Sequence, residues 1–374
     1  MGGAEQNLLS LVAELPSPGY RHHLAWVKPI SEGATEMGPA FAPYMASMIP
    51  LYEGARASLP AAPLRLARWL RGSRIDVIHA QLILPQLVAR AASIAAGGVP
   101  VITTWQNAYY DDDALGGFGD SRRRRAIFRT LDRLSGRSDR HFIGVSEHVA
   151  RSCADNLGVS MDRVSVVYNS VARSRFAAAT PEELDRLRAE LGVTAATRVL
   201  LSVGRLSEQK RHGDTIDAMP AVLARHPGTL LLIAGRGPLT EQLREQAKAR
   251  GVADAVRFLG VRGDVAALYQ LADVFVFPSR YEGLALALIE ALANALPAVV
   301  SDIPQNREAA LGVEEAVRFV SASEPLAPAI VKALDDRATL RAAALAKVAA
   351  LRERFSPTRL AAQFASIAEA AARR

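Results

Sequence analysis

The stretch from Val274 to Val300 constrains the fold most, because it reads as a strand, a helix and a second strand in close succession. The apolar run Val274–Phe277 is typical of a buried strand. The segment Pro278–Gly283 breaks that pattern and predicts a loop. The good helix formers of Leu284–Asn294 predict a helix, and Ala298–Val300 a further strand. A chain with this order of elements favours an α/β fold built on a parallel sheet.

Two carboxylates in this stretch, Glu282 and Glu290, are separated by seven residues. Eight helical positions turn through about 80° beyond full turns, so the two side chains do not form a close acid/base pair. We expect them to hold two different parts of one extended ligand. The backbone N–H groups at the predicted helix start would suit a phosphate between them; they belong to Gly283, Leu284, Ala285 and Leu286. The alternative is a buried core helix without a ligand.

The same alternation of strands and helices extends through the chain in two series. We therefore predict two Rossmann-like domains with parallel sheets facing across a cleft. The predicted boundaries are 1–175, 176–355 and a C-terminal helix over 356–374 that packs back toward the N-terminal domain. Residues 30–60 read as irregular with one helix, and residues 326–350 as helical. Gly2-Gly3 leads directly into a helix, so a first N-terminal strand is expected to be missing.

Two further strand ends carry candidate ligand-binding residues. Gly204 follows the strand at 199–203, and Arg205 and Lys210 then place two cations where they would neutralise a diphosphate leaving group. Gly235 follows the next strand and resembles the start of a dinucleotide fingerprint. Thr240 replaces its third glycine, which disfavours nicotinamide-dependent redox chemistry. The alternative for the two cations is ordinary surface charge.

The net charge of +7 is concentrated locally, since residues 121–140 hold eight Arg and two Asp. This pattern predicts an amphipathic helix that attracts an anionic membrane or a phosphate-bearing acceptor; the arginines concerned are Arg122, Arg123, Arg124, Arg125 and Arg129. A solvated surface is the alternative, and the absence of interleaved aromatic residues disfavours nucleic acid. The single cysteine, Cys153, favours a reducing compartment, and no signal peptide is evident. We expect a cytoplasmic protein that associates with the inner face of the membrane.

The motifs VGRLSEQK, AGRGP, and PSRYEG with its Glu-x7-Glu pair, in this order, resemble glycosyltransferase family 4 (glycosyl transferases group 1). The resemblance implies the GT-B fold and transfer of a sugar with retained anomeric configuration. It also implies a nucleotide-sugar donor, UDP- or GDP-linked, and no metal or other cofactor. The acceptor would be a glycan or a lipid-linked sugar in cell-surface polysaccharide or glycolipid synthesis.

The resemblance also implies roles for individual residues. Arg205 and Lys210 would bind the diphosphate, Glu282 the transferred sugar, Glu290 the ribose, and the backbone near Val261 the base. On the acceptor or phosphate side it implies residues of the N-terminal half; these are Gly2, Gly3, Gln106, Tyr109 and Asn169.

One departure from the family pattern leaves other functions open. Gln106 stands where the family commonly has a histidine, and an amide orients a hydroxyl but cannot act as a base. Together with the missing strand, this motivates a catalytically lapsed sugar-nucleotide binding protein as the alternative. A GT-B sugar-nucleotide epimerase is a third reading.

Overall fold

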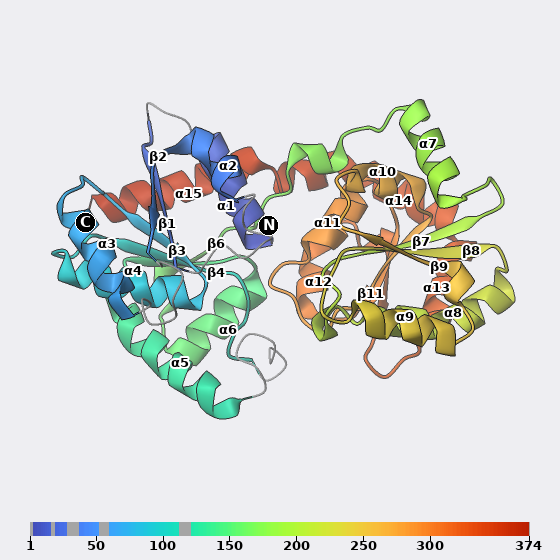
Figure 1. The fold of residues 1–374 in the computed structure, drawn as a ribbon, viewed down its shortest axis with the longest axis horizontal. Helices are drawn as coiled ribbons and strands as arrows, with labels where there is room; N and C mark the ends of the chain where they lie inside the picture. Colours follow the sequence, from blue (N-terminus) through green and yellow to red (C-terminus); the bar gives the residue numbers. More distant parts are fainter. Residues whose placement is uncertain (1–2, 16–18, 28–36, 52–59, 112–120, 374) are drawn as a thin grey trace. The chain divides into compact units, whose positions relative to one another are not determined.

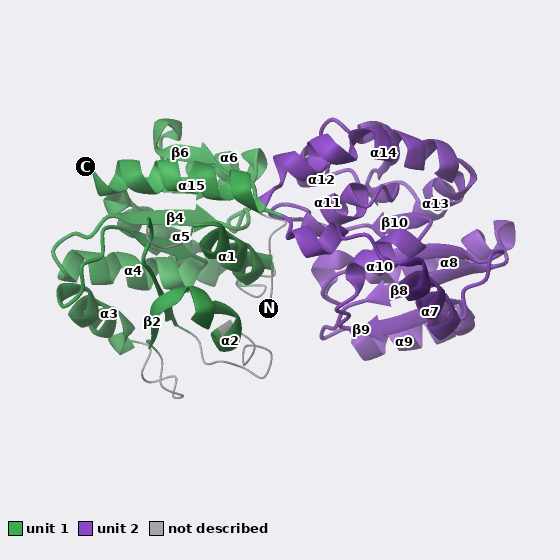
Figure 2. Cartoon of the chain, turned by 90° about the horizontal axis from the view of Figure 1, so that it is seen from above, with its two compact units in different colours: residues 1–170, 357–374 green, residues 171–356 purple. Residues whose placement is uncertain are grey.

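The computed structural model describes residues 3–15, 19–27, 37–51, 60–111 and 121–373. It divides the chain into two compact units, of which unit 1 comprises residues 1–170 and 357–374 and unit 2 residues 171–356 (Figure 2). Both units are α/β with open, wholly parallel sheets, which confirms the predicted fold class.

Unit 1 holds two sheets in the described part of the chain (Figure 1). A four-stranded sheet has the order β3-β4-β5-β6, and a separate parallel pair joins β1 to β2. The strands are β1 (His22–Trp26), β2 (Met45–Pro50), β3 (Ile78–Gln81), β4 (Val101–Trp105), β5 (His141–Gly144) and β6 (Val164–Val166). The helices are α1 (Gly3–Glu14), α2 (Met37–Phe41), α3 (Ala62–Arg71), α4 (Ile83–Ala95), α5 (Arg122–Ser135), α6 (Glu147–Leu157) and α15 (Pro357–Ala372).

The C-terminal helix α15 belongs to unit 1, although about 190 residues separate it from β6 along the chain. Its Leu360 and Ala361 share a buried cluster with Leu11 of α1 and with Ile102 and Ile143 of the sheet. Helices α1 and α15 therefore cover one face of the four-stranded sheet together.

Unit 2 is built on one six-stranded sheet with the order β12-β11-β10-β7-β8-β9. Its strands are β7 (Arg198–Val203), β8 (Thr229–Ala234), β9 (Val256–Gly260), β10 (Val274–Phe277), β11 (Ala298–Ser301) and β12 (Val317–Val320). Its helices are α7 (Pro181–Leu191), α8 (His212–Arg225), α9 (Thr240–Ala249), α10 (Val265–Leu271), α11 (Leu286–Ala293), α12 (Pro304–Ala309), α13 (Leu326–Asp335) and α14 (Arg337–Arg354).

The central strands of unit 2 are continuous apolar runs because helices cover both faces of the sheet. Every residue of β8 and β10 is buried. Residues of α8, α9 and α13 pack with these strands in one large cluster, which includes Ile216, Leu243 and Ile330. Figure 1 shows α10, α11 and α14 on the opposite side of the sheet.

The structure corrects several expected elements. Residues 45–50, expected to be irregular, form β2, and β12 was not expected. The segment 326–350 is helical, as expected, and consists of two helices that are separated at Asp336. Helix α11 begins at Leu286, two residues later than expected.

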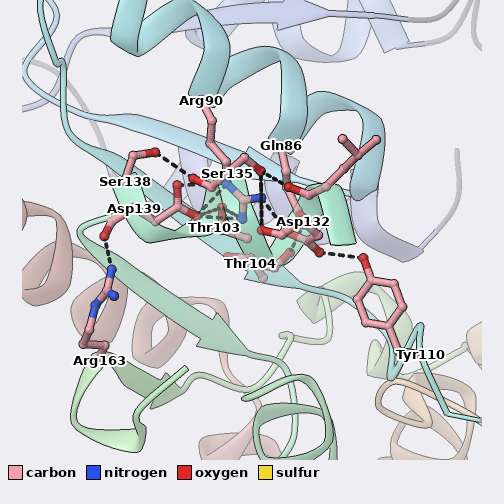
Figure 3. A network of polar contacts seen from close by, with 11 residues as sticks. Gln86, Arg90, Thr103, Thr104, Tyr110, Asp132, Ser135, Ser138, Asp139 and Arg163 are labelled. Carbon is pink, nitrogen blue, oxygen red and sulfur yellow. Dashed lines mark hydrogen bonds and ion pairs between the residues drawn. The ribbon is translucent and has the colours of Figure 1, made fainter. Parts of the chain in front are cut away.

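A buried arginine holds the helices of unit 1 against the sheet (Figure 3). Arg90 of α4 is fully buried; its Nε donates to the Asp139 carboxylate at 2.9 Å and its Nη1 to Oδ1 of Asp132 on α5. Thr103 of β4 donates to Asp139 Oδ2 at 2.7 Å. Burial raises the pKa of Asp139, although the Arg90 guanidinium opposes this shift. We call Arg90, Thr103, Asp132 and Asp139 the Arg90 network.

Replacing Arg90 with methionine is expected to destabilise unit 1 by about 3–5 kcal/mol, because it leaves two buried carboxylates without their cation. Chemical denaturation followed by circular dichroism would measure the loss. The matched control is Arg68→Met on exposed α3 surface, for which a change within about 0.5 kcal/mol is expected. Equal stability of the two variants would contradict the structural role of the Arg90 network.

Candidate active site in unit 2

The predicted donor-binding residues gather at the carboxyl ends of adjacent strands in unit 2. Strand β7 lies between β10 and β8, and all three run parallel. Their carboxyl ends therefore meet at one edge, where parallel α/β sheets bind ligands. The segments after them are 204–211, 235–239 and 278–285.

The loops after β7 and β8 touch through glycine backbone. Gly235 has φ +143°, and a Cβ atom there would lie 1.9 Å from the Gly204 carbonyl oxygen. The Leu206 N–H donates to the Arg236 carbonyl at 3.1 Å, and the Leu239 N–H donates to the Leu206 carbonyl at 3.1 Å. Only glycine fits at position 235, so this close approach fixes how the loops after β7 and β8 lie against each other.

Three contacts join the loop after β7 to the loop after β10. Lys210 Nζ lies 2.6 Å from Glu282 Oε1 in a largely buried ion pair. The Arg280 N–H donates to the Gln209 carbonyl at 2.8 Å, and Gln209 Nε2 donates to the Tyr281 carbonyl at 2.9 Å. The ammonium of Lys210 also lies 4.7 Å from the centre of the Phe277 ring, a cation–π distance. The structure thus brings two of the predicted catalytic residues into direct contact.

Two other predicted residues lie on the surface of the same edge. The Arg205 side chain is exposed, and Val261, after the end of β9, is 74% exposed.

The start of α11 is only partly open to a ligand. The Leu286 N–H donates to the Leu284 carbonyl at 2.8 Å, so this predicted phosphate donor is already used in a turn. Gly283, Leu284 and Ala285 precede the helix and are buried, with Ala285 at the N-cap position. Helix α11 therefore begins later than expected, and the role of these N–H groups toward a phosphate stays a prediction.

Glu290 lies on the second turn of α11 and has partners of its own. Tyr269 Oη donates to its Oε2 at 3.0 Å, and Arg175 Nε lies 3.7 Å from its Oε1. Burial raises the pKa of Glu290, and Arg175 and Tyr269 oppose that shift. Neither Tyr269 nor Arg175 was expected from the sequence, because no local pattern distinguishes them from a core tyrosine and a surface arginine.

A buried histidine, also not expected from the sequence, follows Lys210. His212 opens α8 with 2% of its surface exposed. Burial lowers its pKa to about 4, and the positive charge of Lys210 acts in the same direction. The ring is therefore neutral near pH 7 and adds no charge beside the Lys210–Glu282 pair.

The predicted acceptor-side residues of unit 1 form a separate polar chain. Gln106 follows β4; its Nε2 donates to Gln81 Oε1 at 3.0 Å, and its Oε1 accepts from Asn169 Nδ2 at 2.9 Å. His79 contacts Thr104 Oγ1 at 2.8 Å, and burial lowers its pKa to about 4. Gln106 thus has two amide partners in unit 1.

The other predicted residues of unit 1 differ in their placement. The Tyr109 hydroxyl is buried and makes no hydrogen bond within the described part of the chain, and burial raises its pKa. Gly3 is the exposed first residue of α1, and Gly2 lies outside the described residues. Among the residues that the structure describes, no three His, Cys, Asp or Glu side chains cluster as metal ligands.

Replacing Gly235 with alanine is expected to destabilise unit 2 by about 2 kcal/mol or more, because the new methyl group clashes with the Gly204 carbonyl at a strained φ. Urea denaturation of both variants would measure this against Gly263→Ala, whose Cβ meets nothing within 4 Å. If the two variants unfolded at the same urea concentration, the close approach of the two loops would be refuted.

Comparisons with known proteins agree with this fold. The chain matches the model Glycosyltransferase Family 4 over residues 1–175 and the model Glycosyl transferases group 1 over residues 185–349. The structure of Anabaena Alr3699/HepE in complex with UDP and glucose superposes with a TM-score of 0.79 at 20% identity, covering 99% of this chain and 96% of that one.

The relatives found by sequence include two named transferases. The putative glycosyltransferase EpsF of Bacillus subtilis is 29% identical over 64% of this chain and 60% of its own length. An Escherichia coli enzyme named UDP-Gal:alpha-D-GlcNAc-diphosphoundecaprenol alpha-1,3-galactosyltransferase is 25% identical over 65% of this chain and 62% of its own length. The match spans less than two thirds of either relative. The two family models and the GT-B architecture of the neighbours place the chain in glycosyltransferase family 4 (glycosyl transferases group 1).

Proposed function

We propose that the protein transfers a sugar from a nucleotide-sugar donor to a glycan or lipid-linked acceptor, with retention of anomeric configuration and without a metal ion. The observation that carries the proposal is the Lys210–Glu282 pair, held at 2.6 Å where β7 and β10 end. Family membership supports it, as does the UDP-glucose complex of the Anabaena neighbour. The name of the E. coli relative supports a UDP-sugar donor and a lipid-linked acceptor.

The pair suits the two charges that a donor brings to the site. A nucleoside diphosphate leaving group gains negative charge as the glycosidic bond breaks, and Lys210 with Arg205 would neutralise it. Glu282 would accept hydrogen bonds from hydroxyls of the sugar, since a carboxylate accepts more bonds than the one from Lys210. Each partner would orient the other before the donor arrives.

The remaining donor contacts follow from the same edge of the sheet. Glu290 would bind the ribose, and the Tyr269 and Arg175 contacts would hold its carboxylate in place. The backbone near Val261 would face the base, and the N–H groups before α11 would face the phosphates. Gln106, with Asn169, would orient an acceptor hydroxyl rather than act as a base.

A catalytically lapsed binding protein and a sugar-nucleotide epimerase are the rival functions. The first would bind a donor without turning it over. The second would interconvert donor sugars without an acceptor. Both are separated from a transferase by following the fate of the nucleotide and of the sugar in one assay.

Incubation with a panel of UDP- and GDP-sugars is expected to give binding, slow nucleotide release, and faster release with a suitable acceptor. Glu282→Gln is expected to lower kcat/KM by about 10²-fold, because the amide keeps the shape but loses the charge that orders Lys210 and the sugar. Nucleotide release measured by chromatography, and the anomeric coupling of the product by NMR, would check this.

Glu208→Gln is the matched control, since Glu208 is exposed in the same loop, and its rate should change by less than about twofold. Absence of binding to every donor would refute the proposed function as a whole. Full activity of Glu282→Gln would refute only the role of that residue, and binding without turnover across many acceptors would favour the lapsed protein.

We also propose that unit 1 docks on the cytoplasmic face of an anionic membrane through α5. Ile127, Leu131 and Leu134 are 51%, 47% and 55% exposed and follow one another at helical spacing. Arg123 and Arg124 are exposed one turn before them. An apolar stripe beside arginines fits the boundary between headgroups and acyl chains. In the described part of the chain, no helix is long and apolar enough to cross a bilayer.

The variant Ile127→Ser/Leu131→Ser is expected to bind vesicles containing phosphatidylglycerol about tenfold or more weakly, because two inserted apolar side chains are lost. Vesicle cosedimentation would measure binding. The control Leu64→Ser/Leu345→Ser removes two leucines that are 67% and 65% exposed on other helices. Similar losses for both variants would count against α5 as the docking surface.

A further inference from the structure

The arginines of α5 lie on two different faces of the helix. At about 100° per residue, Ile127, Leu131 and Leu134 project within about 60° of one another. Arg122, Arg125 and Arg129 also project within about 60° of one another, but their mean direction lies about 170° from that of the apolar residues, on the opposite side of the helix. The stripe proposed for the membrane therefore does not explain these three arginines.

These three arginines line one pocket. The pocket has a volume of about 370 Å³ and lies along α5, α6 and the segment that follows β4. Its lining residues are Tyr110, Asp111, Arg122, Arg125, Ala126, Arg129 and Asn156. We call it the arginine pocket. It is distinct from the donor residues, which lie in unit 2, and from the Gln106–Asn169 chain.

Buried contacts fix the walls of the arginine pocket. Tyr110 Oη donates to Asp132 Oδ2 at 2.7 Å, and the other oxygen of Asp132 accepts from Arg90 (Figure 3). Tyr110 is thereby attached to the Arg90 network. Arg125 Nη1 donates to the Asp111 carbonyl at 2.9 Å. A site with walls held in this way loses little conformational entropy when a ligand binds.

Among the described residues that line the arginine pocket, the single carboxylate, that of Asp111, already has hydrogen-bond partners. Asp111 accepts from His148 at 3.1 Å, from Ser152, and from Asn156 at 3.4 Å. Burial alone would raise its pKa, but these three partners lower it overall. Neither Arg122 nor Arg129 has an acidic partner within the part of the chain that the structure describes. Both residues are exposed and line the same pocket.

We propose that the arginine pocket binds the phosphate group of a phosphate-bearing acceptor. Guanidinium groups bind phosphate oxygens in paired, charge-assisted hydrogen bonds, and two or three on one face suit a single phosphate. A volume of about 370 Å³ also admits the group that the phosphate esterifies. The phosphate would belong to a lipid-linked or a soluble acceptor. This identification of the acceptor class rests on the proposed transferase function, whereas binding of phosphate does not.

The test is phosphate binding to the full chain in the absence of any donor, by isothermal titration at constant ionic strength. Inorganic phosphate is expected to bind, and Arg122→Met/Arg129→Met is expected to weaken it by at least about tenfold through loss of two charge-assisted contacts. Arg137→Met/Arg140→Met removes the same charge from exposed positions after α5 that do not line the arginine pocket, and it is expected to change the affinity by less than about twofold. Both pairs are exposed, so thermal unfolding should show all variants folded.

Two further titrations identify the source of the phosphate. Glucose 1-phosphate represents a soluble acceptor, and dihexanoyl phosphatidic acid below its micellar concentration represents a lipid-linked one. One of these two compounds is expected to bind more tightly than inorganic phosphate, and Arg122→Met/Arg129→Met is expected to lose that binding. This result would support the arginine pocket and show whether the acceptor is soluble or lipid-linked. No binding of any of the three, or an equal loss in Arg137→Met/Arg140→Met, would overturn it. Failure of the donor assays with intact phosphate binding would refute the transferase function and leave an anion site.

Discussion

Parallel pairing of β7 with β10 on one side and β8 on the other is the constraint on which the donor site depends. Each strand ends at the same edge, so three loops from distant parts of the sequence converge there. The glycine contact between positions 204 and 235 sets the spacing of two of these loops, and the Lys210–Glu282 pair joins the third. A buried ion pair contributes little net stability, but losing one partner leaves the other charge unpaired. We therefore interpret the Lys210–Glu282 pair as a contact that orients the two side chains rather than one that stabilises the fold.

Elements with local chemical signals were predictable from the sequence. Ser146 caps α6 by accepting from the Val149 N–H at 3.2 Å, as its position before an apolar helical pattern indicates. Pro181 begins α7 after the capping residue Thr180. The strands of unit 2 were predictable because sheets covered on both faces require continuous apolar runs. The family resemblance rested on these same strand ends and their glycines.

Other features depend on contacts that no local pattern contains. Strand β12 is short, with Arg318 inside it, and becomes a strand by pairing with β11. Helices α13 and α14 are separated at Asp336, where no proline or glycine in the sequence indicates a break. The partners of Glu290 come from residues 269 and 175, so its ion pair could not be read from its own helix. The turn that uses the Leu286 N–H likewise depends on a backbone hydrogen bond that composition does not reveal.

The Arg90 network explains how a single helix can present two different surfaces. On an isolated helix, neighbouring arginines would repel one another, and the helix could turn about its own axis. Its positive charge would then act as one diffuse patch. Asp132 is the buried anchor of α5: Arg90 holds one of its oxygens and Tyr110 the other. The rotation of the helix is thereby fixed, with Ile127 outward and Arg125 toward the Asp111 carbonyl. A shift of α5 by one residue would leave the buried Asp132 carboxylate without its partners. Such a shift would therefore cost more free energy than a rearrangement of apolar side chains. Residues that belong to two different surfaces of the helix can therefore be adjacent in the sequence, as Arg122 and Arg123 are.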